Sequence, residues 1–337
     1  MKYRGCQFVP ETVSDIGELH LIKHIREIAG EPSAGVGIGD DAAVIDVGTE
    51  TYLLATTDAL ADGVHFLTSQ IPARSLGRKA IAVNLSDIAA MGGIPTSVLV
   101  SLALPASTPV EFVHELYRGM RHEADTHGAT IVGGNITSTP GPIAITVTVL
   151  GSVSKSSLSL RTGAQIGDVL ATTGTLGNAA AARLITERSR GWEERWGTFV
   201  SASQVPTPRL KAASALATVG IPHAMLDISD GLASEVRRIG EASGVGALLH
   251  SDSLPISEEV QQVSEELNLD PLDLALYGGE DYELLVALSR GSLHEAEALL
   301  AEEPLHVVGE VVPREVGFTL ETDGKSTPLA AEGWTHF

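Results

Sequence analysis

Cysteine is nearly absent from this sequence, because Cys6 is the only thiol among 337 residues. One cysteine cannot form a disulfide within the chain, and it cannot build a multi-cysteine zinc or iron–sulfur site. Nothing in the sequence indicates an oxidising compartment, so we expect the protein in the cytoplasm. Aromatic residues are also scarce at 4%, whereas glycine occurs 35 times. This composition predicts many tight turns and a core of Ala, Val, Leu and Ile.

Positively charged residues are also few. Lys and Arg number 22 against 43 Asp and Glu, which gives a formal net charge of −21. Such a charge repels nucleic-acid phosphates and anionic lipid surfaces, so we expect neither nucleic acid nor a membrane as a partner. An anionic substrate would need local help, most simply from metal ions.

Long hydrophobic runs are missing as well. The apolar stretch at residues 98–104 is interrupted by Ser101 and followed by Pro105, and it is far shorter than the ~20 residues of a membrane span. The first 15 residues lack the apolar core of a signal peptide. We therefore expect a soluble globular protein.

Helix-like and strand-like patterns alternate along both halves of the chain. Apolar residues on a three-residue rhythm predict an amphipathic helix over residues 14–30, ended by Gly30. Further helices are predicted at 72–91, 109–127, 178–188 and 208–219, and strands at 43–47, 52–57, 64–66, 97–104, 130–132, 143–150, 169–172 and 223–226. At roughly 150 residues per domain, we expect two α/β (α+β) domains, residues 1–150 and 151–337.

Two familiar nucleotide-binding motifs are missing. Gly-Lys-Ser at residues 324–326 lacks the glycine five positions earlier that a Walker A loop needs, so we interpret it as a hairpin turn. Gly-Ile-Gly-Asp-Asp-Ala at residues 37–42 imitates a dinucleotide fingerprint, but it opens a strand-like run rather than a helix. Neither segment therefore predicts a standard nucleotide fold.

Carboxylates stand in glycine-rich or apolar turns, where solvated surface acids are rare. They are Asp40, Asp41, Asp58, Asp62, Asp87, Asp227, Asp230, Glu280, Asp281 and Glu283. Hard oxygen ligands suit Mg²⁺, which shares its shell among one or two carboxylates, water and phosphate oxygens. For any single acid, a helix cap or a turn is an equal alternative. For Asp41, Asp58, Asp87 and Asp227 together we favour metal binding.

Four other features carry open alternatives. The turn at residues 172–178 leads from a strand into a helix, and its N–H groups either hold a phosphate or only form the turn. Arg161 either contacts a nucleotide phosphate through its planar fork or is a surface arginine. His65 is a substrate contact or a structural histidine, and Ser229 is a helix cap compatible with ligand binding. Spacing alone indicates no Ser/His/Asp nucleophile.

Taken in order, these motifs resemble the thiamine-monophosphate kinase family. The matching motifs are GIGDDAA at 37–43, TTD at 56–58, GVHF at 63–66, KAIAVNLSDIAAMG at 79–92, GG at 133–134, VLG at 149–151, TGTLG at 173–177, DISDGL at 227–232 and GGEDYEL at 278–284. The resemblance runs from about residue 14 to the terminal His336 and Phe337. Each piece alone is weak, whereas the ordered set is specific.

The resemblance implies ATP-dependent phosphorylation of thiamine monophosphate to thiamine diphosphate by direct in-line transfer. It also implies the two-domain fold shared with aminoimidazole ribonucleotide (AIR) synthetase, in a homodimer whose N-terminal mixed sheets form a barrel. No general base is expected, because the attacking phosphate oxygen is already largely ionised at pH 7. Alignment of two anionic groups and screening of their charge would then dominate catalysis.

By family match, each site residue takes a role. The resemblance assigns several Mg²⁺ ions to Asp41, Thr57, Asp58, Asp87, Asp227 and Asp230. It assigns ATP to Gly134, Arg161 and Ser229, and thiamine monophosphate to His65, Glu280 and Trp334. The thiazolium ring of thiamine is cationic, which an acid or an aromatic face favours.

The chain departs from the family pattern at Asn135, where a metal-binding Asp usually follows Gly133 and Gly134. An Asn ligates through its carbonyl oxygen without charge, so we keep Asn135 among the predicted ligands and expect one Mg²⁺ to bind more weakly. The alternatives are a non-catalytic ATP- or metal-binding paralogue, or a kinase for another phosphorylated acceptor. Two other members of the superfamily are disfavoured. Selenophosphate synthetase uses a Cys or selenocysteine followed by Lys in a glycine-rich stretch, whereas Gln7 follows Cys6 here. The hydrogenase-maturation carbamoyl dehydratase needs a C-terminal Cys, whereas this sequence ends in Phe337.

Overall fold

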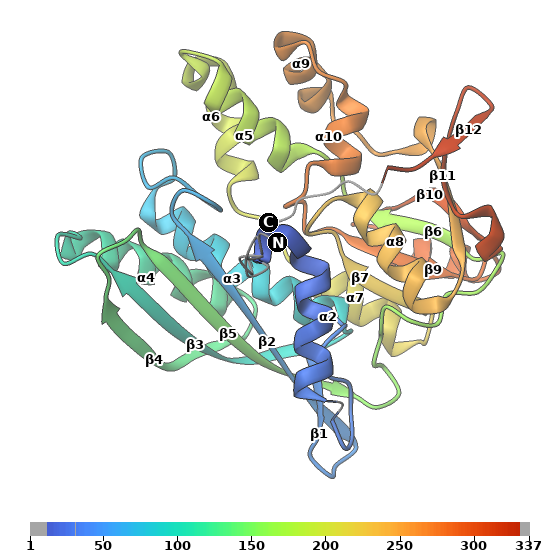
Figure 1. The fold of residues 1–337 in the computed structure, drawn as a ribbon, viewed down its shortest axis with the longest axis horizontal. Coiled ribbons are helices and arrows are strands. Elements are labelled where there is room, and N and C mark those ends of the chain that lie inside the picture. The colour runs from blue at the N-terminus through green and yellow to red at the C-terminus, as the bar shows by residue number, and fades with distance from the viewer. Residues whose placement is uncertain (1–11, 31, 331–337) are drawn as a thin grey trace, which may run out of the picture.

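The computed structural model describes residues 12–30 and 32–330, which fold around two β-sheets (Figure 1). The first sheet has the strand order β1-β2-β5-β3-β4. Its strands are β1 (Ala43–Asp46), β2 (Thr51–Ala61), β3 (Ile94–Leu104), β4 (Thr130–Ser138) and β5 (Ala144–Ser154). Only β3 and β4 pair in parallel, and the other neighbours are antiparallel. The sheet carries helices on one face, α3 (Ala73–Ala90) and α4 (Val110–Thr126).

The two faces of this sheet differ because side chains alternate along a strand. Along β5, Ile145, Val147 and Val149 are buried in the core under α3 and α4. The residues between them, and exposed residues of β3 such as Leu99, face the opposite side. The outer face is therefore half-exposed, whereas the inner face is buried under the two helices.

Helix α3 connects the two sheets. Thirteen of its eighteen residues are buried, which is expected for a helix that packs on every side. Leu85 and Ile88 belong to the core of the first sheet, whereas Ala89 and Ala90 join a cluster with Leu216 and Met225 from the second half. Small side chains at this end let α3 approach the second sheet closely.

The second sheet has the strand order β12-β11-β8-β10-β6-β9-β7. Its strands are β6 (Val169–Thr173), β7 (Pro222–Asp227), β8 (Gly246–His250), β9 (Leu284–Leu288), β10 (Leu305–Val312), β11 (Phe318–Thr322) and β12 (Lys325–Pro328). Helix α8 (Leu232–Ser243) covers one face, and α7 (Leu210–Thr218) with α11 (Leu293–Leu299) covers the other. Strand β9 is buried throughout for this reason.

Four helices form a smaller cluster beside the second sheet (Figure 1). They are α5 (Asn178–Arg188), α6 (Trp192–Ser203), α9 (Glu258–Leu267) and α10 (Pro271–Tyr277). Trp196 is buried at the centre of this cluster, and its Nε1 donates to Glu266 at 3.1 Å. The short 3₁₀ helices η1 (Ser251–Ser253) and η2 (Arg314–Val316) complete the described elements.

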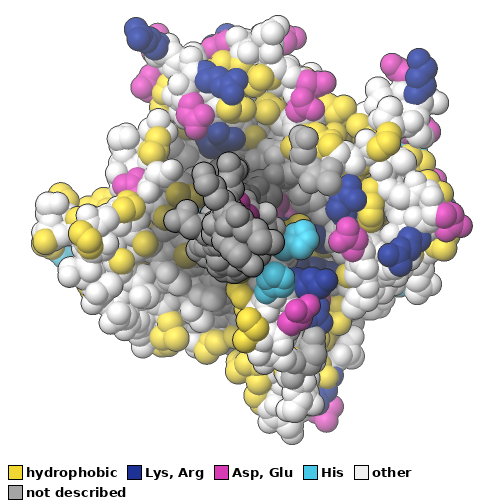
Figure 2. Space-filling model, in the orientation of Figure 1, with side chains coloured by type: hydrophobic (Ala, Val, Ile, Leu, Met, Phe, Trp, Pro, Cys, Tyr) yellow, Lys and Arg dark blue, Asp and Glu magenta, His cyan; other side chains and the backbone are white. Residues whose placement is uncertain are grey.

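The N-terminal helix predicted over residues 14–30 is two helices. Gly17, with φ 73°, separates α1 (Val13–Ile16) from α2 (Glu18–Ala29). The apolar rhythm of α2 does not face a core, because Leu19, Ile25 and Ile28 are exposed. Figure 2 shows hydrophobic side chains on the surface along this part of the molecule.

Other local predictions have mixed outcomes. The helix predicted at residues 178–188 is α5, and the Gly-Lys-Ser segment is the predicted hairpin turn, with Asp323 and Gly324 at φ 50° and 72°. The strand predicted at residues 64–66 is wrong, because this segment is a turn closed by a bridge between Asp62 and Phe66. None of the described helices has the length and apolar character to span a bilayer. The division into domains at residues 150 and 151 stays a prediction.

Candidate active site

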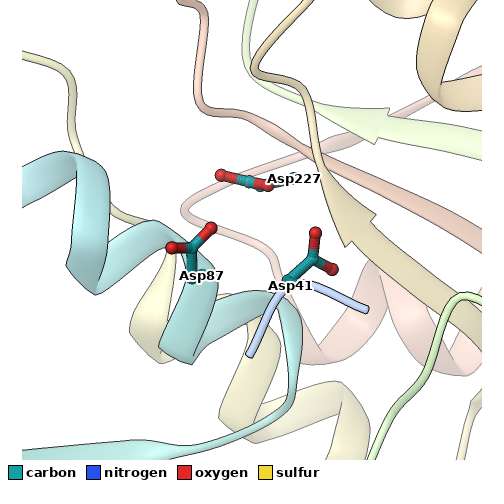
Figure 3. A group of neighbouring side chains, drawn as sticks. All are labelled: Asp41, Asp87 and Asp227. Carbon is teal, nitrogen blue, oxygen red and sulfur yellow. The ribbon is translucent and has the colours of Figure 1, made fainter. Parts of the chain in front are cut away.

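Three of the predicted metal ligands meet where the two sheets adjoin. Asp41 lies in the loop before β1, Asp87 on α3 and Asp227 at the end of β7. One carboxylate oxygen of each lies within 4.8 Å of the others, and the side chains point toward one another (Figure 3). Residues separated by up to 186 positions, 227 − 41, are thus brought to one point.

Burial disfavours the ionised form of these acids in the absence of a cation. Burial, and then the charge of Asp58, raises the pKa of Asp87 well above its usual range. Burial, and then the charge of Asp41, does the same to the pKa of Asp227. Like charges at such distances cannot all ionise unless a positive charge joins them.

Two hydroxyl groups offset part of this cost. Thr56 Oγ1 donates to Asp87, and Ser86 Oγ donates to Asp227 at 2.5 Å. Both donors are buried, and both favour the ionised carboxylate. Sequence inspection missed them, because a hydroxyl beside a motif acid gives no signal of its own.

Asp41 provides the sharpest test of whether a cation fits. Its Oδ1 accepts from Arg161 Nε at 3.1 Å and also contacts Arg161 Nη2. Its Oδ2 is buried and has no hydrogen-bond partner. A buried oxygen without a partner is costly, and a divalent ion among hard oxygen donors would satisfy it. The donor set therefore fits Mg²⁺.

Asp58 extends the cluster from strand β2. Burial, followed by the charges of Asp230 and Asp41, raises the pKa of Asp58 to about 6. Its backbone N–H donates to the side chain of the buried Asn84 at 3.1 Å, which fixes the strand against α3.

Thr57 lies on the other side of its strand. Its hydroxyl donates to the carbonyl oxygen of Val147 at 3.1 Å and accepts from Thr148 Oγ1 at 3.0 Å. The structure therefore does not bring this hydroxyl to the acids. The threonine hydroxyl that reaches them is that of Thr56, as the alternation of a strand requires.

Arg161 and Asp230 lie on the flank of the cluster. Arg161 pairs with Asp41, and its backbone N–H donates to Asp40 at 3.3 Å. Asp230 pairs with Arg238, which also binds Glu235 at 2.8 Å. Two arginines thus balance part of the negative charge around the acids.

Ser229 stands between Asp227 and Asp230, in the turn before α8. Its carbonyl oxygen accepts from the backbone N–H of Glu280 at 2.7 Å. Its hydroxyl lies 3.5 Å from Glu235, at the limit of a hydrogen bond. It lines the same cavity as Asp58 and Asp230.

A cavity of about 630 Å³ opens beside the acids. Asp58 and Asp230 line it together with two predicted substrate contacts, His65 and Glu280. His65 Nδ1 accepts from the backbone N–H of Ala61 at 3.1 Å. Apolar walls come from Phe66, Leu67, Ile71, Val83 and Val200. A cavity that joins apolar walls to a few charged groups is typical of a small-molecule site.

Gly134 and Asn135 lie away from the cluster within one chain. They belong to β4, an exposed edge strand. In the strand register, Asn135 of β4 pairs with Ser101 of β3, Ser101 pairs with Thr146 of β5, and Thr146 pairs with Ala59 of β2, the residue after Asp58. Three strand spacings separate the ends of this row, or about 14 Å. Asn135 therefore does not join these acids in a single chain, and Trp334 lies outside the described residues.

The turn at residues 172–178 already binds a side chain of the chain itself. The carboxylate of Asp281 accepts from the backbone N–H of Gly177 at 2.9 and 3.1 Å, at the start of α5. Of the two alternatives for this turn, the geometry favours the structural one, because a side chain takes the place that a phosphate would need.

Comparisons with known proteins agree with this geometry. Two family models match the chain. The model of the N-terminal domain of AIR synthase related protein matches residues 39–153, and the model of its C-terminal domain matches residues 165–320. The thiamine-monophosphate kinase of Rhodopirellula baltica is 36% identical over 312 residues, covering 90% of this chain and 92% of the relative. That of Aquifex aeolicus is 33% identical, covering 96% and 99%. The chain belongs to the thiamine-monophosphate kinase family.

Solved structures of this family share the fold. A structure described as AaThiL complexed with AMPPCP and TMP matches with a TM-score of 0.85 and 31% identity, over 98% of this chain and 100% of that one. Thiamine-monophosphate kinase from Stenotrophomonas maltophilia matches with a TM-score of 0.74 and 32% identity, over 91% and 96%. The predicted family, the two-domain α/β fold class and the phosphotransferase class are confirmed.

Proposed function

We propose that the chain transfers the γ-phosphoryl group of ATP to thiamine monophosphate and so forms thiamine diphosphate. The observation that carries this proposal is the meeting of Asp41, Asp87 and Asp227, which come from both halves of the chain, beside a cavity that Asp58 and Asp230 line. Membership of the thiamine-monophosphate kinase family supports the acceptor. The relative's complex with AMPPCP, an ATP analogue, and TMP supports the same pair of ligands here.

The acids would hold Mg²⁺ in this reaction. Asp41, Asp87 and Asp227 form the centre, and Asp58 and Asp230 extend it toward the cavity. Thr57 and Asn135, predicted as further ligands, stay proposals because neither side chain lies among these acids. Bound there, Mg²⁺ supplies positive charge that screens the repulsion between the phosphates of ATP and of the acceptor.

The chain's own groups would mainly align the reactants. An oxygen of the acceptor phosphate forms the new bond to the γ-phosphorus, and the bond from that phosphorus to the leaving ADP oxygen breaks in line with it. The attacking oxygen is already ionised near pH 7, so no side chain has to remove a proton. Gly134, Arg161 and Ser229 are proposed to contact ATP, and His65, Glu280 and Trp334 the acceptor.

A homodimer is part of the proposal. The outer face of the first sheet is half-exposed, and two apolar side chains of β3 on this face, Ile94 and Leu99, are 61% and 39% exposed. An apolar sheet face of this kind is typical of an interface. A second copy on this face would also cover the strand that carries Gly134 and Asn135. The cytoplasmic location stays a prediction.

The decisive experiment measures thiamine diphosphate formed from ATP and thiamine monophosphate, with and without Mg²⁺. We expect product only with Mg²⁺, and none from unphosphorylated thiamine. Turnover of a different phosphorylated acceptor in place of thiamine monophosphate would favour the alternative kinase. Thermal stabilisation by ATP and Mg²⁺ without any product would favour the non-catalytic paralogue.

A further inference from the structure

Lys79 is a buried cation that the family match does not place in the site. It lies on α3, its side chain is only 9% exposed, and its ammonium faces the cavity. Nζ donates to Glu280 Oε1 at 2.6 Å and to the carbonyl oxygen of His65 at 3.2 Å. A single ammonium thus contacts both described residues that we propose for the acceptor.

These two partners come from different halves of the chain. His65 belongs to the turn that follows β2 in the first half of the chain, and Glu280 to the loop before β9 in the second half. Lys79 and Glu280 are separated by 201 residues in sequence. The ion pair therefore fixes the distance between two segments that no shared element holds together.

The Glu280 loop needs such support because its backbone is strained. Glu280 and Tyr282 have φ of 61° and 52°, the left-handed region that residues other than glycine rarely adopt. Their backbone N–H groups donate to the carbonyl oxygens of Ser229 at 2.7 Å and Ile228 at 2.8 Å. These bonds attach the loop to the turn between Asp227 and Asp230. Strained residues persist where neighbouring contacts hold them, and they concentrate at functional sites.

We propose that Lys79 is a positioning residue for the acceptor. Its ammonium holds the Glu280 carboxylate and the His65 turn in the arrangement that receives thiamine monophosphate, beside the acid cluster. This inference rests on the proposed function. Lysine suits the role because its ammonium carries three hydrogen-bond donors on one compact charge, so it can bind two acceptors at once.

The matched variants come from the same helix. Lys79→Met keeps the length of the side chain and removes the charge, and Lys79→Arg keeps the charge. Arg78→Met is the control, because Arg78 lies one residue away and pairs with the buried Glu123 at 2.7 Å, outside the cavity. It removes a cation from another ion pair of α3 that does not line the cavity, so it controls for the loss of a charged side chain from this helix.

Steady-state kinetics separates positioning from structure. We expect Lys79→Met to raise KM for thiamine monophosphate about tenfold or more, the effect of one lost hydrogen bond to a charged group. KM for ATP should change less than about twofold, which is within the effect of weak contacts. Lys79→Arg should recover part of the loss, and Arg78→Met should leave both KM values near the wild type while lowering Tm. Equal changes in both KM values for Lys79→Met would overturn the proposal.

A double-mutant cycle tests the same idea through the partner. In a Glu280→Gln background, Lys79→Met should raise KM less than it does in the wild type, because the ion pair is already lost and only the contact with the His65 carbonyl oxygen remains. Independent, multiplicative losses would contradict the assignment. If Lys79→Met does not fold, Lys79→Gln provides the same cycle with a polar replacement. Failure of wild-type turnover would refute the proposed function, whereas normal wild-type turnover with an unchanged acceptor KM in the variants would refute only the role of Lys79.

Discussion

Metal-free and Mg²⁺-bound protein should respond to pH in opposite directions between pH 4 and pH 7. Burial raises the pKa of Asp58 from 3.8 to about 6, with the charges of Asp230 and Asp41 as further causes. Because the folded-state pKa is raised, the protonated group contributes stability that is fully present below the unfolded value and is lost as pH rises through 6. A shift of this size corresponds to about 3 kcal/mol against ionising Asp58 in the folded chain.

Mg²⁺ reverses this dependence because it binds the ionised carboxylates. At pH 5 about nine in ten Asp58 side chains would be protonated if the pKa is about 6, so through this group alone Mg²⁺ should bind about tenfold more weakly than at pH 7. Burial raises the pKa of Asp87 and of Asp227 as well, which steepens the effect. The metal-free protein should therefore lose stability toward pH 7, while the gain in Tm from a fixed Mg²⁺ concentration grows.

Thermal unfolding at pH 5, 6 and 7, with and without Mg²⁺, measures both trends. Calorimetric titration with Mg²⁺ in two buffers of different ionisation enthalpy counts the protons that binding releases. Asp58→Asn is the internal control, because it keeps the shape of the side chain and removes its titration. A Mg²⁺-induced change in Tm that is the same at pH 5 and pH 7, without proton release, would refute the reasoning.

Three further outcomes follow from packing and hydrogen bonding. Gly77→Ala should destabilise the protein by about 1–3 kcal/mol, because its Cβ would lie 2.0 Å from a backbone oxygen of α4, whereas Gly197→Ala has nothing within 4 Å and should not lower Tm. Asp281→Ala should cost about 1–3 kcal/mol in urea unfolding, because it removes the acceptor at the start of α5. Thr56→Val should raise the pKa of Asp87 by removing its donor, so half-maximal activity should require more Mg²⁺ at pH 6 than in the wild type. Unchanged Mg²⁺ demand in Thr56→Val would contradict the role of that hydrogen bond.

Local patterns were sufficient for most elements of the fold. The helix at residues 178–188 was predicted with its observed bounds, because its cap and apolar rhythm are local signals. The break at Gly17 and the helix α6 were missed, since one glycine interrupts a periodic pattern without changing it and α6 has a mixed composition. Strand β4 runs to Ser138, beyond its predicted end, because pairing with β3 rather than its own residues sustains it.

The acids of the site were recognisable because carboxylates in apolar turns are unusual. Their convergence was a hypothesis, and the structure brings Asp41, Asp87 and Asp227 together. The contact between Lys79 and Glu280 had no sequence signal, because it depends on how two distant segments meet. Which face of β2 holds Thr57 depends on the register of the strand, which short motifs do not specify.

The most direct test of the account compares three proteins in one assay. Formation of thiamine diphosphate from ATP and thiamine monophosphate, with Mg²⁺ in excess, is followed for the wild type, for Asp87→Asn and for Asp252→Asn. Asp87 is a member of the acid cluster, whereas Asp252 is an exposed acid in η1. The account predicts a loss of about 100-fold or more in Asp87→Asn and wild-type rates in Asp252→Asn. Full activity in a folded Asp87→Asn variant would contradict the central claim that the cluster supports phosphoryl transfer.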